Sequence, residues 1–139
     1  MFDCAKIAIF HTNSTAMKEG SIFLTDLEFE YRLWKNRLSY YLKELALLKA
    51  RNEELLQRDE ARAMNTVELM VLEDHESELQ QLEKRIKVQE EEMQYYNKDF
   101  PITPTHEYMG AHLILRDKIN RICALHRDKA DDLLRALGI

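Results

Sequence analysis

The sequence predicts an all-α protein, a long antiparallel helical hairpin extended to a three-helix bundle with coiled-coil-like packing. Composition, apolar periodicity and the position of the prolines predict this fold class. The 139 residues are 45% hydrophobic and 32% charged, with 3 glycines and 2 prolines. A typical globular domain has roughly 25% charged residues and more turn formers. Long helices need few turns and expose wide polar faces, whereas a strand-rich chain reverses direction more often.

The first helix is expected over residues 24–64. From Leu24, apolar residues recur at alternating spacings of four and three, the pattern of a helix packed along another helix. The next two positions of this pattern are Asp59 and Arg62, so the apolar stripe ends before them. The stripe consists of Leu27, Tyr31, Trp34, Leu38, Tyr41, Leu45, Leu48, Asn52 and Leu55.

The second helix is expected over residues 66–99, because a second stripe starts out of phase with the first. Asn65 and Glu68 have the spacing of a capping box, which marks a helix start. The alternative is one continuous helix of roughly 110 Å through both stripes; the break in phase favours a reversal. The second stripe consists of Leu72, His75, Leu79, Leu82, Ile86, Gln89, Met93, Tyr96 and Phe100.

The third helix is expected over residues 105–137. Pro101 and Pro104 end the second helix, since proline lacks an N–H group and clashes with the preceding turn. Thr103 or Thr105 is the expected cap, and Gly138 is a plausible stop. The third stripe consists of Tyr108, His112, Leu115, Ile119, Ile122, His126 and Leu133.

Residues 1–23 differ from the rest and are expected to form an arm that packs on the bundle at 24–139. Residues 6–10 could form a short strand or a helical turn. The apolar run at residues 7–10 is too short for a signal peptide. No run approaches the roughly 20 residues that span a bilayer. Cys4 and Cys123 lie far apart, which fits a reducing compartment. A cytoplasmic protein is therefore expected.

The charge pattern argues against nucleic acid and membranes as partners. The net charge is −5, and residues 66–100 carry 10 acidic against 4 basic side chains. Proteins that bind phosphate backbones or anionic lipids need a concentrated basic surface. No segment of this chain is strongly basic.

The aromatic residues predict an interaction surface at one end of the bundle. All 12 aromatics lie within residues 2–41 or 95–108, and two reversals bring these segments together. Aromatic side chains are enriched at interaction sites, although at helical spacing they are also common in cores. In each adjacent tyrosine pair, one ring must point away from the seam. The expected surface consists of Tyr31, Trp34, Tyr40, Tyr41, Tyr95, Tyr96, Phe100 and Tyr108.

Polar residues within the stripes predict a core layer that fixes the register of the helices. A buried polar residue penalises registers that leave it unpaired. Equal rise per residue places Asn52 level with Leu79 and His126, and His75 near His126. A small polar pocket is the alternative function of this layer.

Cys123, His126 and His75 are weak candidates for a metal site. Cys123 and His126 are one helical turn apart, and His75 is expected to face them. Two or three ligands without a fourth make a poor zinc site. No histidine follows an acidic residue at the Glu-x-x-His spacing of di-iron bundles. We expect no metal or other cofactor here, and interpret the three as core residues.

No catalytic motif is present, so an enzyme is not expected. With 3 glycines, the chain has no phosphate-binding loop, dinucleotide fingerprint or nucleophile elbow. The narrow stripes in residues 48–92 bury little surface alone and favour a further helix. We expect a structural or protein–protein interaction module that self-associates, most simply as a dimer. A small-ligand or metal-binding helical bundle is the alternative.

Overall fold

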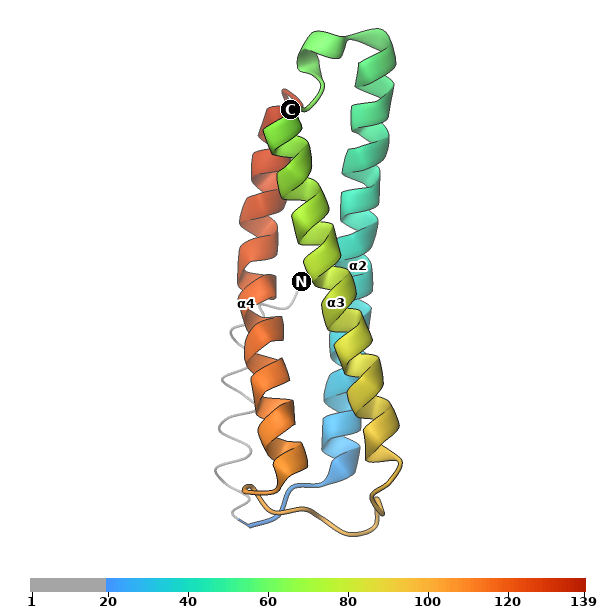
Figure 1. The fold of residues 1–139 in the computed structure, drawn as a ribbon, viewed down its shortest axis with the longest axis vertical. Helices are drawn as coiled ribbons and strands as arrows, with labels where there is room; N and C mark the ends of the chain where they lie inside the picture. The colour runs from blue at the N-terminus through green and yellow to red at the C-terminus, as the bar shows by residue number, and fades with distance from the viewer. Residues whose placement is uncertain (1–19) are drawn as a thin grey trace.

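A computed structural model of the chain describes residues 20–139, in which three long helices pack along one another (Figure 1). Helix α2 spans Leu24–Arg58, α3 spans Thr66–Met93 and α4 spans Glu107–Ala136. A 3-10 turn, η1, spans Glu60–Arg62 between α2 and α3. The chain reverses after α2 and after α3, so α2 and α4 run in the same direction. The predicted all-α three-helix bundle is confirmed.

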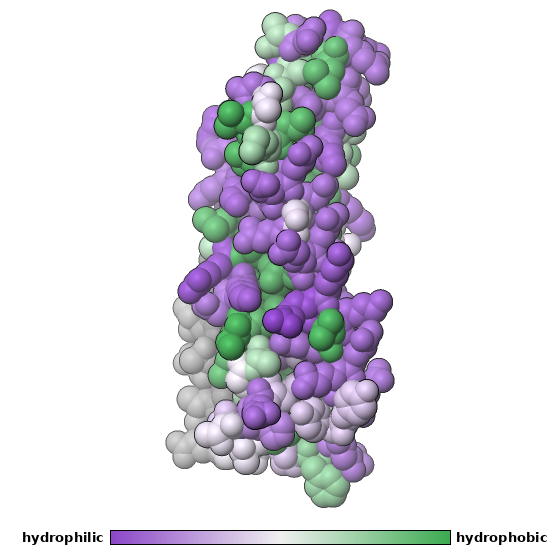
Figure 2. All heavy atoms as spheres, viewed as in Figure 1, coloured by the Kyte–Doolittle hydropathy of each residue, from purple (hydrophilic) through white to green (hydrophobic). Residues whose placement is uncertain are grey.

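The core consists mainly of the predicted stripes, which face one another along the bundle axis, although Phe100 at the end of the second stripe is exposed. Leu38, Leu45, Leu72, Leu79 and Ile119 are essentially inaccessible to solvent. Polar side chains cover most of the face shown in Figure 2, with apolar side chains gathered in smaller patches. None of the helices in residues 20–139 has an apolar stretch of the length that would cross a membrane.

The turn between α2 and α3 starts earlier than expected, since α2 ends at Arg58 rather than near residue 64. The apolar stripe of α2 ends there, and the chain folds back so that Met64 is buried. The buried Asn52 side chain accepts a hydrogen bond from the Met64 N–H at 2.7 Å. Helix α3 then begins at the predicted capping box, in which Asn65 and Glu68 bond reciprocally at 2.8 and 2.9 Å.

The turn between α3 and α4 is longer than expected, since α3 ends at Met93 rather than near residue 99. The last turn of α3 carries three consecutive glutamates at 90–92 and no basic residue. Negative charge is unfavourable at a helix C-terminus, which shortens the helix. Helix α4 begins at Glu107, and its cap is His106 rather than Thr103 or Thr105. Gly138 follows α4 with a φ of 77°, as expected for a stop.

An isolated antiparallel bridge joins the segment before α2 to the α3–α4 connection, at the base of the bundle. Ile22 and Ile102 exchange two backbone hydrogen bonds of 2.8 Å, and both side chains are buried. This bridge ties the start of α2 to the α3–α4 connection. The expected packing of the N-terminal arm falls largely on residues 1–19, which lie outside the described residues.

The capping box at Asn65 gives a direct test of the first reversal. Replacing Asn65→Ala removes the acceptor for the Glu68 N–H, so the free energy of unfolding should fall by about 1 kcal/mol. Asn65→Asp keeps a carboxylate oxygen as the cap and should change stability by only a few tenths of a kcal/mol. Urea unfolding measures both. Equal stability of the wild type and Asn65→Ala would show that this box does not fix the start of α3.

Candidate functional site

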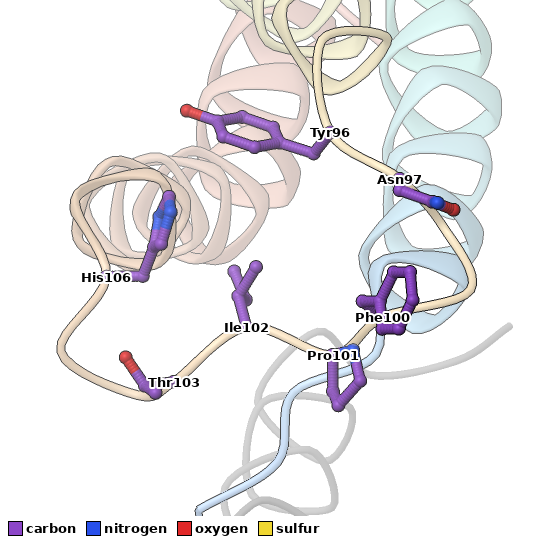
Figure 3. Close-up of a pocket in the computed structure, with 7 residues that line it drawn as sticks. All are labelled: Tyr96, Asn97, Phe100, Pro101, Ile102, Thr103 and His106. Carbon is purple, nitrogen blue, oxygen red and sulfur yellow. The ribbon is translucent and has the colours of Figure 1, made fainter.

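A pocket opens at the base of the bundle, in the connection between α3 and α4 (Figure 3). Its volume is about 310 Å³. The Tyr96 and His106 rings form one side of it, with centroids 5.2 Å apart. Apolar and aromatic groups predominate in a lining completed by a few polar groups. The lining residues are Tyr96, Asn97, Phe100, Pro101, Ile102, Thr103 and His106.

His106 is both a wall of the pocket and the N-cap of α4. Its Nδ1 accepts a hydrogen bond from the Tyr108 N–H at 3.0 Å, so Nδ1 carries no hydrogen. A neutral imidazole has one N–H group, which must therefore be on Nε2. The cap thus leaves the Nε2–H group of His106, a residue of the pocket lining, as a hydrogen-bond donor.

Two aromatic side chains of the α3–α4 connection are exposed to solvent. Tyr95 is 88% exposed and Phe100 is 67% exposed. The segment is attached to Ile22, which precedes α2, by the bridge at Ile102, and to α2 by an ion pair between Lys98 and Glu28. The two aromatic rings are therefore presented by a backbone that is anchored on both sides.

A buried ion cluster lies beneath this end, between α2 and α4. The Glu30 carboxylate, 2% exposed, accepts bonds from Arg116 Nε at 2.9 Å and Nη2 at 2.6 Å. It also contacts His112 Nε2 at 2.8 Å. The His112 ring stacks on Trp34 at 5.0 Å between centroids. Charge-assisted bonds of this kind are the strongest that side chains make.

The cluster continues into α3 through two buried tyrosines. His112 Nδ1 lies 3.0 Å from Tyr31 Oη, which lies 2.7 Å from Tyr108 Oη. The Tyr108 hydroxyl donates to the Gln89 backbone carbonyl at 2.6 Å. From His112 to Gln89 the network therefore links all three helices.

Counting hydrogens along this network assigns the protonation state of His112. The chain from Glu30 through His112, Tyr31 and Tyr108 to the Gln89 carbonyl has four short contacts, each of which needs one hydrogen. Two tyrosine hydroxyls and a neutral imidazole supply three. A fourth hydrogen is present if His112 is an imidazolium ion, which donates from both nitrogens. Among residues 20–139, the cluster then contains one anion and two cations.

The electrostatics agree with an ionised Glu30. Burial raises the pKa of this carboxyl, but the hydrogen bonds from His112 and Arg116 outweigh burial and lower the pKa to about 2. Burial raises the pKa of Tyr108 to about 12 and raises that of Tyr31 further. Both tyrosines are therefore neutral hydroxyls near pH 7.

A second polar cluster lies nearer the middle of the bundle. His75 Nε2 lies 2.8 Å from His126 Nδ1, and His126 Nε2 lies 3.1 Å from Glu44 Oε1. The structure thus brings together two of the three residues of the predicted polar layer. The third, Asn52, bonds to Met64 instead. Helix α2 ends earlier than expected, and Glu44 rather than Asn52 lies beside His126.

The predicted interaction surface divides into buried and accessible residues. Tyr31, Trp34, Tyr41 and Tyr108 are 7% exposed or less, so these four are core residues and do not present a surface. Tyr96 is half-buried beside the pocket. The accessible remainder comprises Tyr40, Tyr95 and Phe100.

The weak metal candidates do not form a ligand cage. Within residues 20–139, no group of three or more His, Cys, Asp or Glu side chains is arranged to hold a metal ion. Cys123 is buried among the core residues of the bundle. His75 and His126 bond to each other through their ring nitrogens.

The sequence interpretation missed Glu30 and Arg116 as buried residues. Each lies one position beside a stripe residue, Tyr31 or Leu115, where a charged side chain is usually solvated. Their opposite charges near the starts of two helices that run in parallel were the available signal.

Comparisons of the chain with family models, curated proteins and solved structures find no match.

The buried ion cluster predicts a large effect of Glu30→Gln. This change removes the anion that the buried Arg116 and His112 side chains contact, so the free energy of unfolding should fall by about 3–5 kcal/mol. Glu54→Gln is the control, since the Arg51–Glu54 pair of 2.9 Å is exposed. The control should change stability by less than about 1 kcal/mol. Urea unfolding at pH 7 compares them, and equal effects would contradict a structural role for the cluster.

The pH profile of stability gives a second readout of the same comparison. The pKa of Glu30 is about 2 when folded and 4.5 in the unfolded reference, so its stabilisation is complete above pH 4.5. Stabilisation of about 3 kcal/mol is then lost as the pH falls from 4.5 to 2. Glu30→Gln should lack this share of the acid dependence. A variant with the wild-type slope in that range would show that Glu30 is not held as an anion.

Proposed function

We propose that this chain is a protein–protein interaction module that self-associates, with the partner surface at the α3–α4 connection. The observation that carries the proposal is the pair of exposed aromatic side chains, Tyr95 and Phe100, beside an aromatic-lined pocket. Side chains of this size are usually buried, and exposed apolar groups that gather at one place favour association. Aromatic residues also contribute most to binding at protein interfaces.

The size and lining of the pocket favour a side chain of a partner as its occupant. At about 310 Å³, the pocket is at the lower end of the 300–1,000 Å³ typical of small-ligand sites. Its walls of Tyr96, Phe100 and Ile102 suit one apolar side chain. The Nε2–H group of His106 suits a neighbouring carbonyl oxygen.

The rigid layer beneath the pocket supports a binding role. Tyr108 follows the His106 cap by two residues and belongs to the buried network. Tyr96 packs against Tyr108, with ring centroids 5.3 Å apart. A surface that is already ordered loses less conformational entropy on binding, which strengthens association.

Self-association and its location are tested together by sedimentation equilibrium. We expect the wild type to exceed the 16.5 kDa monomer mass at tens of micromolar. Phe100→Ser removes a large apolar side chain from the surface, so the dissociation constant should rise by about 10- to 100-fold. Val67→Ser is the matched control, since Val67 is 69% exposed and begins the opposite end of α3.

Three outcomes separate the parts of this proposal. A dimer weakened by Phe100→Ser and unchanged by Val67→Ser supports both self-association and its location. A dimer weakened by Val67→Ser alone would place the interface at the other end of the bundle. A wild-type protein that remains at 16.5 kDa would contradict self-association.

A further inference from the structure

One hydrogen-bonded network contains a single side chain from each of the three helices. Glu44 of α2 contacts His126 of α4 at 3.1 Å, and His126 contacts His75 of α3 at 2.8 Å. His75 is fully buried and His126 is 3% exposed. Tyr41 stacks on the His126 ring at 3.9 Å between centroids. The Glu44 side chain, 39% exposed, is the end of the network nearest to solvent.

The carboxylate at one end fixes the tautomer of both rings. An ionised Glu44 only accepts hydrogen bonds, so His126 Nε2 carries the hydrogen. A neutral His126 then has a bare Nδ1, which accepts from His75 Nε2–H. A neutral His75 is left with a bare Nδ1, and that atom is buried with no hydrogen-bond partner among the described residues.

The hydrogen-bonded network can bind one additional proton without losing either of its hydrogen bonds. If His126 becomes an imidazolium ion, its Nδ1–H donates to His75, and His75 changes to the Nδ1–H tautomer. The charge on His126 then faces the Glu44 carboxylate. A second proton would make both rings imidazolium ions, each with two N–H groups and no acceptor. The 2.8 Å contact would then bring two N–H groups and two positive charges together.

We propose that the hydrogen-bonded network of Glu44, His126 and His75 is an acid-sensitive latch. It joins α3 to α4 while at most one of the two imidazoles is protonated, and it opens when both are protonated. The latch is separate from the pocket and the surface of the proposed interaction. It gives the bundle a conformational response to pH that the apolar stripes alone would not have.

The groups around the latch oppose a second proton. Burial is the largest cause of the lowered pKa of His75, and positive charge on His126 or Lys129 of α4 lowers it as well; the pKa is about 4. From α2, Glu44 is the acidic group, and Tyr41 covers the His126 ring. Burial lowers the pKa of His126 although Glu44 acts in the opposite direction. On α3, Glu76 follows His75 and is paired with Lys49 of α2 at 3.2 Å.

The direction of the pH dependence follows from these shifts. The folded pKa of His75 is below its unfolded value of 6.5, so the stabilisation by neutral His75 is complete above pH 6.5. It is lost as the pH falls from 6.5 to 4, where the unfolded chain binds the additional proton. Glu30 remains ionised in this range because its pKa is about 2.

The opening is measured by the distance between spin labels at positions 81 and 124. Gln81 is an exposed residue of α3 and Ala124 is an exposed residue of α4. In the wild type, we expect one narrow distance distribution at pH 7.5 and a longer, broader one at pH 4. A distribution that is the same at both pH values would overturn the proposal.

A variant that cannot take the second proton separates the latch from general acid unfolding. His75→Gln keeps an amide donor for His126 Nδ1 and does not titrate, so its distances should remain narrow at pH 4. Glu78→Gln, an exposed change on the same helix, should open as the wild type does. If His75→Gln opens like the wild type, His75 is not the switch.

Two further measurements keep the test decisive if His75→Gln does not fold. In the wild type, protonation of His75 should raise the unfolding equilibrium constant as the pH falls from 6.5 to 4. The increase should be up to about tenfold for each pH unit. Nitrogen NMR of labelled wild-type protein should show hydrogen on Nε2 of both His75 and His126 at pH 7.5. Hydrogen on Nδ1 of either ring at that pH would contradict the arrangement on which the latch depends.

Discussion

The carboxylate of Glu30 is the constraint on which the lower half of the bundle depends. An isolated carboxylate in a protein interior is very unfavourable, so its position is tolerated only where cations and hydrogen-bond donors surround it. Arg116 and His112 supply them from α4, and His112 extends the network through Tyr31 and Tyr108 to α3. Moving α2 or α4 along its axis would break the bonds of Glu30 to Arg116 and His112, and moving α3 would break the bond from Tyr108 to the Gln89 carbonyl.

We expect the two polar clusters to fix the register of helices whose apolar stripes alone would tolerate sliding. Leucine-rich seams repeat every seven residues, so a shifted register still buries apolar surface. Glu30 with Arg116, and Glu44 with His126, each join α2 to α4 at a defined level. The clusters differ in their expected charge, since the hydrogen count predicts an imidazolium ion at His112, whereas burial lowers the pKa of both His75 and His126. A bundle of this kind is ordered near neutral pH and presents Tyr95 and Phe100 from a fixed base.

Apolar periodicity and turn chemistry predicted the helices, the capping box at Asn65 and the stop at Gly138. The ends were less predictable: α3 ends directly after three adjacent glutamates, and α2 ends before the segment whose Met64 N–H bonds to the Asn52 side chain. The pairing of His75 with His126 followed from equal rise along antiparallel helices. Glu30 and Arg116 could not be assigned to the core from the sequence, since burial of a charge depends on its partner in space.

The protonation state of His112 in the wild-type protein tests the buried ion cluster most directly. Nitrogen NMR of ring-labelled histidine at pH 7 distinguishes an imidazolium ion from either neutral tautomer. An ionised Glu30 beside four contacts that each need a hydrogen predicts that both ring nitrogens of His112 are protonated. A neutral His112 ring, with hydrogen on one nitrogen only, would contradict the cluster and the register that we expect it to fix.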